Sequence, residues 1–381
     1  MTEELILTNA RVVLRDRIID GTVYTRDGRI VAVDDAVTQS PGAIDCDGDY
    51  LLPGMVELHT DNLERHFTPR PKVQWHPVAA VMAHDAQMAA AGITTVFDAI
   101  ACGDVGQGFS RIKHLDEMLA ALEATQARGH LRADHKIHLR CEVSWSEAAT
   151  TFESLLDDEL LLVVSVMDHS PGQRQFTRED KYRDYFMGKH GMTAAEMDAF
   201  TARQLEASAL YSDPNRKAIA EHCRRRGLVL ASHDDATLAH VAEAEVLGVD
   251  FSEFPTTQEA AEAAHRADMR VLMGAPNLVR GVSHSGNVSA GTLAQAGCLD
   301  ILSSDYVPVS LMHGVFMLTR APYGMALPDA VAKASTVPAA VVGLEDRGAI
   351  ESGRRADLVR VLDTGDVPVI RTVWREGRQI A

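Results

Sequence analysis

Eight apolar runs divide the middle of the chain, and stretches with helical spacing lie between them. Apolar runs that alternate with helical patterns predict βα units and a parallel sheet. Eight such units in succession favour a closed (β/α)8 barrel of the TIM-like class over an open sheet. The expected strands are Met55–Leu58, Ile93–Asp98, Ile137–Glu142, Leu160–Met167, Leu228–Ser232, Val249–Phe254, Arg270–Gly274 and Asp300–Ser304.

Helical signals between the runs are clearest in two places. Arg111–Arg128 has leucine and methionine side chains at helical spacing, and Asp213-Pro214 suits the start of a helix over Asn215–Arg226. The interval over residues 170–211 is too long for an ordinary loop between a strand and a helix. It is either a surface insertion or a lid that carries cations, Arg174 among them, to a substrate.

The two ends of the chain differ from the middle, because they hold short β-rich segments separated by turn signals such as Asp27-Gly28 and Glu376-Gly377. Neither end is long enough to bury a core alone. We therefore expect residues 1–52 and 346–381 to pair into one small β-sandwich domain, with the barrel over residues 53–345.

Imidazole and carboxylate groups gather where the expected strands run out into loops. The strand ends of a barrel with loops above them are where such enzymes keep their chemistry. Imidazole and carboxylate are also the ligands that suit zinc, manganese or iron. The sequence therefore predicts a metal hydrolase whose candidate ligands are His59, Asp61, Glu142, His169, His233 and Asp305.

Two of these carboxylates have more than one interpretation. Glu142 lies in an apolar setting, where a carboxylate is costly unless it is paired or bound to a metal. It is either a bridge between two metal ions or the partner of Arg140 in a salt bridge. Asp305 is either a helix N-cap or the catalytic group that accepts the proton of an attacking water and also contacts the metal.

Donor groups cluster in the loop Gly274–Asn287, whose glycines would let backbone N–H groups approach a phosphate. The spacing is not that of a Walker loop. A second group of cations lies in a proline-stiffened loop beyond the first strand and is either solvated or an anion contact. The candidate substrate-binding residues are Arg70, Lys72, Arg140, Arg174, Asn277, Arg280, His284 and Asn287.

Composition narrows the choice of partners. The formal net charge of the 381 residues is −17, which disfavours nonspecific nucleic-acid binding and requires a local cluster of Arg and Lys for any anionic substrate. Five scattered cysteines fit a reducing compartment better than a disulfide framework. The apolar runs are too short to span a bilayer, and no secretory signal pattern is present. We expect a cytoplasmic protein with no membrane partner.

Several strings resemble the amidohydrolase superfamily. Leu52–Asp61 is similar to its first-strand motif, and Gly348–Leu362 is similar to its C-terminal β segment. Within the superfamily, further strings resemble the PhnM-type family of the carbon–phosphorus lyase pathway. These strings are His59–Asn62, Phe67–Lys72, His138–Glu142, Met167–Phe176, Ser232–Thr237, Leu272–Asn277 and Leu302–Tyr306.

The resemblance implies a metal-dependent hydrolase that holds one or two zinc ions, with manganese or iron as alternatives. The implied substrate is a small anionic phosphorylated sugar, α-D-ribose 1-methylphosphonate 5-triphosphate, and the implied products are the 5-phosphate and pyrophosphate. The chain departs from the superfamily in having Asp61 as the second member of the usual His-x-His motif, and Glu142 on the third strand instead of a modified Lys on the fourth. His169 and His233 follow the fourth and fifth expected strands, where relatives commonly use the fifth and sixth.

Two rival functions stay open at this point. A cyclic amidase or nucleobase deaminase on the same scaffold would need few cations near the metal, so convergence of Arg140, Arg174 and Arg280 would argue against it. A non-catalytic subunit of a phosphonate-processing complex would hold its metals in a closed structural site. The sequence leaves open the identity of the metal and whether the chain forms a homo-oligomer.

Overall fold

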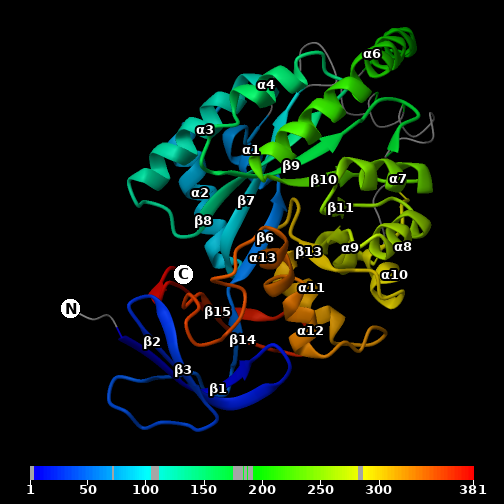
Figure 1. The fold of residues 1–381 in the computed structure, drawn as a ribbon. Coiled ribbons are helices and arrows are strands. Elements are labelled where there is room, and N and C mark those ends of the chain that lie inside the picture. Colours follow the sequence, from blue (N-terminus) through cyan, green and yellow to red (C-terminus); the bar gives the residue numbers. More distant parts are fainter. Residues whose placement is uncertain are drawn as a thin grey trace.

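The computed structural model describes residues 4–70, 73–103, 111–174, 183, 187, 192–281 and 286–381. Eight parallel strands follow one another around a barrel in the order of the sequence (Figure 1). Each lies within or close to an expected run, so the (β/α)8 class is confirmed. The strands are β6 (Met55–Thr60), β7 (Ile93–Cys102), β8 (Asp134–Glu142), β9 (Leu161–Met167), β10 (Val229–His233), β11 (Phe251–Glu253), β12 (Arg270–Gly274) and β13 (Ile301–Ser303).

Helices alternate with these strands along the chain and surround the barrel (Figure 1). They are α1 (Asn62–Phe67), α2 (Pro77–Ala90), α3 (Arg111–Ala127), α4 (Ala148–Ser154), α6 (Ala194–Arg226), α7 (Leu238–Leu247), α8 (Gln258–Arg266), α9 (Ala275–Arg280), α10 (Ala290–Gln295), α11 (Ser310–Leu318), α12 (Leu327–Ala332) and α13 (Thr336–Val341). No helix in the described ranges is both long enough and apolar enough to cross a membrane.

The two ends of the chain meet in a second, mostly antiparallel sheet, as expected (Figure 1). Its strand order is β16-β15-β14-β5-β1-β2-β3, and β4 pairs with β1. The residue boundaries between this sheet and the barrel stay a prediction. The strands are β1 (Glu4–Val13), β2 (Ile18–Arg26), β3 (Arg29–Asp34), β4 (Ile44–Asp45), β5 (Tyr50–Pro53), β14 (Leu358–Leu362), β15 (Val369–Arg375) and β16 (Arg378–Gln379).

The barrel interior is a packed core below the strand ends. One apolar cluster takes side chains from every barrel strand except β8, among them Leu58, Phe97 and Phe251. Because only the interior is common to strands on all sides of a barrel, this cluster fills it. The floor of the site is therefore apolar and dense.

The first and last barrel strands, β6 and β13, are joined through a buried carboxylate. Glu57 is fully buried and accepts hydrogen bonds from the backbone N–H of His59 at 2.7 Å, from the hydroxyl of Ser303 at 2.8 Å and from the N–H of Ser304. These bonds compensate a charge that burial alone would make costly. The N–H of Asp305 also donates to the carbonyl of His59 at 3.2 Å. The closure of the barrel thus holds two candidate site residues, His59 and Asp305, beside each other.

Helix α6 differs from its prediction. The expected start at Asn215 is wrong, because the helix already begins after Thr193, which forms a capping box with Glu196. Pro214 lies inside the helix and removes the bond to the carbonyl of Leu210. Leu210 is 58% exposed, so water can replace that bond.

Of the predicted lid over 170–211, residues 175–182, 184–186 and 188–191 lie outside the described residues.

A buried polar network joins α2 to the outer wall of the barrel. The carboxylate of Asp98 on β7 contacts His84 of α2 at 2.6 Å and His135 of β8 at 2.7 Å. Burial opposes a charged carboxylate, but the two imidazole rings outweigh burial and lower the pKa of Asp98 to about 2. Burial likewise opposes a charged imidazole, yet Asp98 and Asp85 raise the pKa of His135 to about 9. A charged pair inside the structure therefore holds α2 in place.

We predict that Asp98→Asn destabilises the protein by about 3–5 kcal/mol, because it removes the nearer of the two carboxylates that pair with the buried His135 cation. The lowered pKa of Asp98 gives stability that is present above pH 3.8 and is lost as the pH falls toward 2. The raised pKa of His135 gives stability that is present below pH 6.5 and is lost as the pH rises toward 9. Urea unfolding should show the largest deficit between about pH 4 and 6.5.

The matched control is Asp16→Asn, because Asp16 pairs with Arg17 on the surface, where both side chains are more than half exposed. Its free energy of unfolding should change by less than about 0.5 kcal/mol. An Asp98→Asn deficit that is the same at pH 5 and pH 9.5 would contradict the charged-pair interpretation.

Candidate active site and metal centre

The carboxyl ends of the barrel strands surround a cavity of about 240 Å³. Barrel enzymes place their catalytic groups at this end. The lining residues come from the ends of β6, β8, β10, β11, β12 and β13 and from the loops and helix that follow them. They are His59, Asp61, Arg140, His233, Asp234, Phe254, Pro255, Met273, Gly274, Asn277, Arg280, Asn287, Val288, Asp305 and Tyr306.

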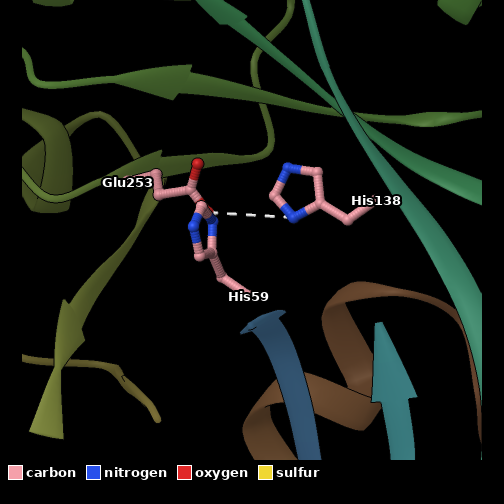
Figure 2. Close-up of side chains that lie close together, drawn as sticks. All are labelled: His59, His138 and Glu253. Atoms are coloured by element: carbon pink, nitrogen blue, oxygen red, sulfur yellow. Dashed lines mark hydrogen bonds and ion pairs between the residues drawn. The ribbon is translucent and has the colours of Figure 1, made fainter. Parts of the chain in front are cut away.

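The first group of possible metal ligands consists of His59, His138 and Glu253 (Figure 2). His59 Nδ1 lies 2.6 Å from Glu253 Oε1, and both side chains are almost fully buried. His138 Nδ1 donates to the carbonyl of Leu58 at 2.8 Å. Burial lowers the pKa of His138 to about 4, so its ring is neutral. Its Nε2 is then a bare lone pair, and it has no hydrogen-bond partner among the described residues.

The second group consists of His169, His233 and Asp234. His233 Nε2 lies 3.4 Å from Asp234 Oδ2, and His169 Nε2 lies 3.9 Å from the same oxygen. That oxygen is buried and accepts no hydrogen bond from the described part of the chain. Three donor atoms therefore face one point. This is the arrangement expected of residues that hold a cation.

A carboxylate lies behind three of the four ligand rings, those of His59, His169 and His233. Glu142 Oε2 contacts His169 Nδ1 at 2.7 Å, and Glu253 Oε2 contacts His233 Nδ1 at 2.9 Å. Glu253 contacts His59 with its other oxygen, so it joins both groups. Burial alone would raise the pKa of Glu253, but the charge of His59 and the other nearby rings hold it well below its usual range. Carboxylates in this position fix the ring orientation and leave Nε2 for a metal.

Two further carboxylates, Asp61 and Asp305, line the cavity. Burial and the neighbouring charge of Asp61 raise the pKa of Asp305 to about 7. Asp61 Oδ1 is buried and has no hydrogen-bond partner in the described ranges. Two partly buried carboxylates that repel each other are stabilised by a divalent cation between or beside them.

The predicted cations do not all reach the cavity. Arg140 and Arg280 line it, and Arg140 is only 9% exposed, with an Nε that lacks a partner among the described residues. Arg174 does not line it, because its two terminal nitrogens donate to Asp235 and Glu243. The geometry therefore does not support the predicted substrate contact of Arg174.

The remaining predicted contacts divide as follows. Asn277 and Asn287 line the cavity, and Asn277 Oδ1 accepts from the N–H of Ala290 at 2.9 Å, which leaves its amide group as a donor. Arg70 is exposed and does not line the cavity. The predictions for Lys72 and His284 fall outside the described residues.

Sequence reasoning missed His138 and Glu253. His138 stands two and four residues before Arg140 and Glu142 on one strand, so its period-two spacing was a signal for a shared face. Glu253 is a carboxylate between Ser252 and Phe254 near the end of an expected strand, a signal of the kind that singled out Glu142. Glu142 itself accepts from Ser144 and His169, and its role as a metal bridge stays a prediction. The strand count is confirmed, since His169 and His233 belong to the fourth and fifth barrel strands.

Comparison with known proteins identifies the family of the chain. No protein-family model matches the chain. The chain is 49% identical over 377 residues to the α-D-ribose 1-methylphosphonate 5-triphosphate diphosphatase of Escherichia coli (strain K12), which covers 99% of this chain and 100% of that protein. The chain belongs to the family of this diphosphatase. The family expected from the sequence strings is thereby confirmed.

Solved structures share the fold of this diphosphatase family member at much lower identity. An amidohydrolase from an environmental sample of the Sargasso Sea has a TM-score of 0.66 at 14% identity and covers 100% of this chain and 93% of that one. N-acetylglucosamine-6-phosphate deacetylase from Pasteurella multocida gives 0.63 at 13%, covering 99% of both chains. 5-Methylcytosine deaminase from Klebsiella pneumoniae gives 0.64 at 14%, covering 99% and 98%. At these identities the likeness shows the amidohydrolase fold alone.

We predict that Glu253→Gln weakens zinc binding by at least about 10-fold, because one carboxylate orients both His59 and His233. An amide can accept from one ring but presents N–H donors to the other. Metal content after dialysis and competition with a chelator measure the change. Glu262→Gln on α8, where Glu262 pairs with Arg266 at the surface, is the control and should bind zinc as the parent does. Unchanged zinc affinity in Glu253→Gln would refute the assigned arrangement.

Proposed function

We propose that the protein hydrolyses α-D-ribose 1-methylphosphonate 5-triphosphate to the 5-phosphate and pyrophosphate in phosphonate breakdown. The observation that carries the proposal is Arg140, a buried cation whose Nε has no partner among the described residues, in a cavity that also holds imidazole and carboxylate groups. A buried charge without a partner is costly, so a bound anion would compensate it. Membership in the diphosphatase family supports the same substrate.

The donor groups fit a divalent metal. His138 Nε2, Asp61 Oδ1 and Asp234 Oδ2 are buried and lack hydrogen-bond partners among the described residues, and all three are atom types that zinc accepts. One ion would be held at His59 and His138, with Glu253 behind the His59 ring, and a second at His169, His233 and Asp234. Asp61, Glu142 and Asp305 stay proposed ligands beside them. Zinc is the proposed metal, with manganese or iron as alternatives.

When bound, the cations would lower the pKa of a water molecule toward neutrality and offset phosphate charge. The chain's own groups complete the reaction. Asp305 accepts the proton of the attacking water from its place near Asp61 in the cavity wall. Arg140 and Arg280 bind the triphosphate and stabilise the charge that builds on the leaving pyrophosphate. Asn277 and Asn287 donate amide hydrogen bonds to phosphate oxygens.

The balance of the reaction is simple. Water oxygen forms a bond to phosphorus, the bridging bond between the α-phosphate and the pyrophosphate group breaks, and the two water protons are shared between Asp305 and the products. A cyclic amidase or nucleobase deaminase remains the alternative. It has less support, because two of the three arginines named as discriminators, Arg140 and Arg280, line the cavity.

We also propose that the protein works in the cytoplasm. The five cysteines are free and buried, as suits a reducing compartment. A lid-like insertion within residues 170–211, of which 194–211 belong to helix α6, remains a proposal, and so does assembly into a homo-oligomer.

Hydrolysis of the triphosphate in ¹⁸O-labelled water tests the activity directly. We expect turnover to pyrophosphate and the 5-phosphate, with one labelled oxygen per cycle. Mass spectrometry of the two products shows which phosphorus is attacked, since the label enters the product that contains it. Zinc-loaded protein that releases no pyrophosphate from this substrate would remove the assignment, and turnover of a cyclic amide in its place would favour the alternative.

We predict that Arg140→Met lowers kcat/KM for the triphosphate by about 100-fold or more, because it removes a buried donor to phosphate. Arg140→Lys should lose less, since it keeps the charge without the planar fork. Steady-state kinetics measure both variants. Arg266→Met, which removes an exposed arginine of α8, is the control and should leave kcat/KM unchanged. Equal activity of Arg140→Met and the parent would contradict the proposed anion site.

A further inference from the structure

Arg174 lies in the loop after β9, five residues beyond His169. Its side chain is only 3% exposed, although the residue belongs to a polar loop. Its φ of +35° is in the left-handed region, which residues other than glycine seldom adopt unless surrounding contacts stabilise it. A buried guanidinium on such a backbone indicates that the surrounding groups determine its position.

One arm of Arg174 reaches the neighbouring strand ends. Its Nη1 donates to Asp235 Oδ1, and Asp235 is fully buried. The other oxygen of Asp235 accepts from the hydroxyl of Ser232 and, at 2.9 Å, from the hydroxyl of Ser252. Ser232 directly precedes His233 on β10, and Ser252 directly precedes Glu253 on β11. Through Asp235, Arg174 therefore contacts the strand ends that carry a ligand ring and the carboxylate behind it.

The other arm of Arg174 reaches two helices. Its Nη2 donates to Glu243 Oε2 on α7 at 2.7 Å, and Glu243 Oε1 accepts from Arg216 Nη1 on α6 at 3.0 Å. Arg216 Nη2 lies 3.8 Å from Asp168 Oδ2, and Asp168 directly precedes His169. The contacts form a closed circuit that starts and ends in the loop of His169.

Helix α6 strengthens this circuit. Asp168 Oδ2 accepts from the hydroxyls of Ser208 at 3.0 Å and Ser212 at 2.7 Å, and both residues belong to α6. Asp168 Oδ1 accepts from the N–H of Ser170 at 3.1 Å. The loop is thus fixed on both sides of His169, by α6 through Asp168 and by β10 and β11 through Arg174.

We propose that Arg174 is a positioning residue, which sets the spacing of His169, His233 and Asp234 by tying the loop after β9 to the ends of β10 and β11. The inference rests on the proposed metal-dependent function. It replaces the substrate contact expected for Arg174 from sequence. Arg can span two carboxylates with separate nitrogens of one planar group, whereas Lys presents one point charge. Substitution by Lys therefore preserves the charge but breaks the circuit.

The test compares Arg174→Met and Arg174→Lys with the parent by titration of the metal-free protein with cobalt(II) alone. We expect cobalt affinity to fall by about 10- to 100-fold in both variants, as for other residues that orient metal ligands. The visible absorption of bound cobalt should also change, because it reports the ligand geometry. Triphosphate kinetics on metal-saturated protein should show a lower kcat with a smaller change in KM.

Two further variants separate positioning from folding. Glu243→Gln weakens the contact with Arg174 Nη2 and leaves the contact with Asp235 unchanged, so we expect a smaller loss of cobalt affinity. This variant replaces Arg174→Met in the test if Arg174→Met fails to fold. Lys217→Met removes an exposed ion pair with Asp213 on the same helix α6 and should leave cobalt binding unchanged.

The outcomes are distinct. Parent-like cobalt affinity and absorption in Arg174→Lys, with only KM raised, would overturn the proposal in favour of substrate binding. Parent-like behaviour of Glu243→Gln and Arg174→Lys in every measurement would overturn it outright. Weakened cobalt binding together with a parent protein that hydrolyses no triphosphate would support the positioning role while refuting the proposed reaction.

Discussion

The closure of the barrel by Glu57 is the interaction on which the site depends. Strands β6 and β13 are the two ends of an otherwise continuous sheet, and between them Glu57 accepts from His59, Ser303 and Ser304. A carboxylate at this depth is tolerable only because these donors surround it. The same bonds place His59 beside Asp305, so the groups from the first and last strands share one cavity. Fold closure and site assembly are therefore one constraint.

A second principle organises the ligands. Each ring has its Nδ1 occupied: Glu253 contacts His59 and His233, Glu142 contacts His169, and His138 donates to a backbone carbonyl. The Nε2 atoms of His169 and His233 face Asp234, and that of His138 is left without a hydrogen bond among the described residues. Without a metal ion, the carboxylates behind the rings also stabilise the positive charge of a protonated imidazole. The arrangement is thus preorganised, which reduces the reorganisation that metal binding requires.

Much of this architecture could be read from the sequence, for a physical reason. Burial makes the barrel strands apolar, so a polar residue at the end of such a run is informative, and this was sufficient for His59, His233 and Asp305. Contacts between side chains on different strands of the barrel could not be predicted, because they depend on the curvature of the barrel rather than on spacing along the chain. Glu253 and Arg174 belong to that class. The long helix α6 was missed because Pro214 is a strong local signal that capping at Thr193 and tertiary packing override.

The charge distribution gives the strongest argument for an anionic substrate. A cation among metal ligands repels the metal, so an amide-hydrolysing site gains nothing from Arg140 in the cavity wall. With a triphosphate bound, the same cation and Arg280 face opposite charge, and the overall charge of −17 is overcome locally. Arg174 does not alter this balance, because Asp235 and Glu243 already neutralise it. The positive charge of Arg140 and Arg280 thus lies in the cavity that would hold the triphosphate.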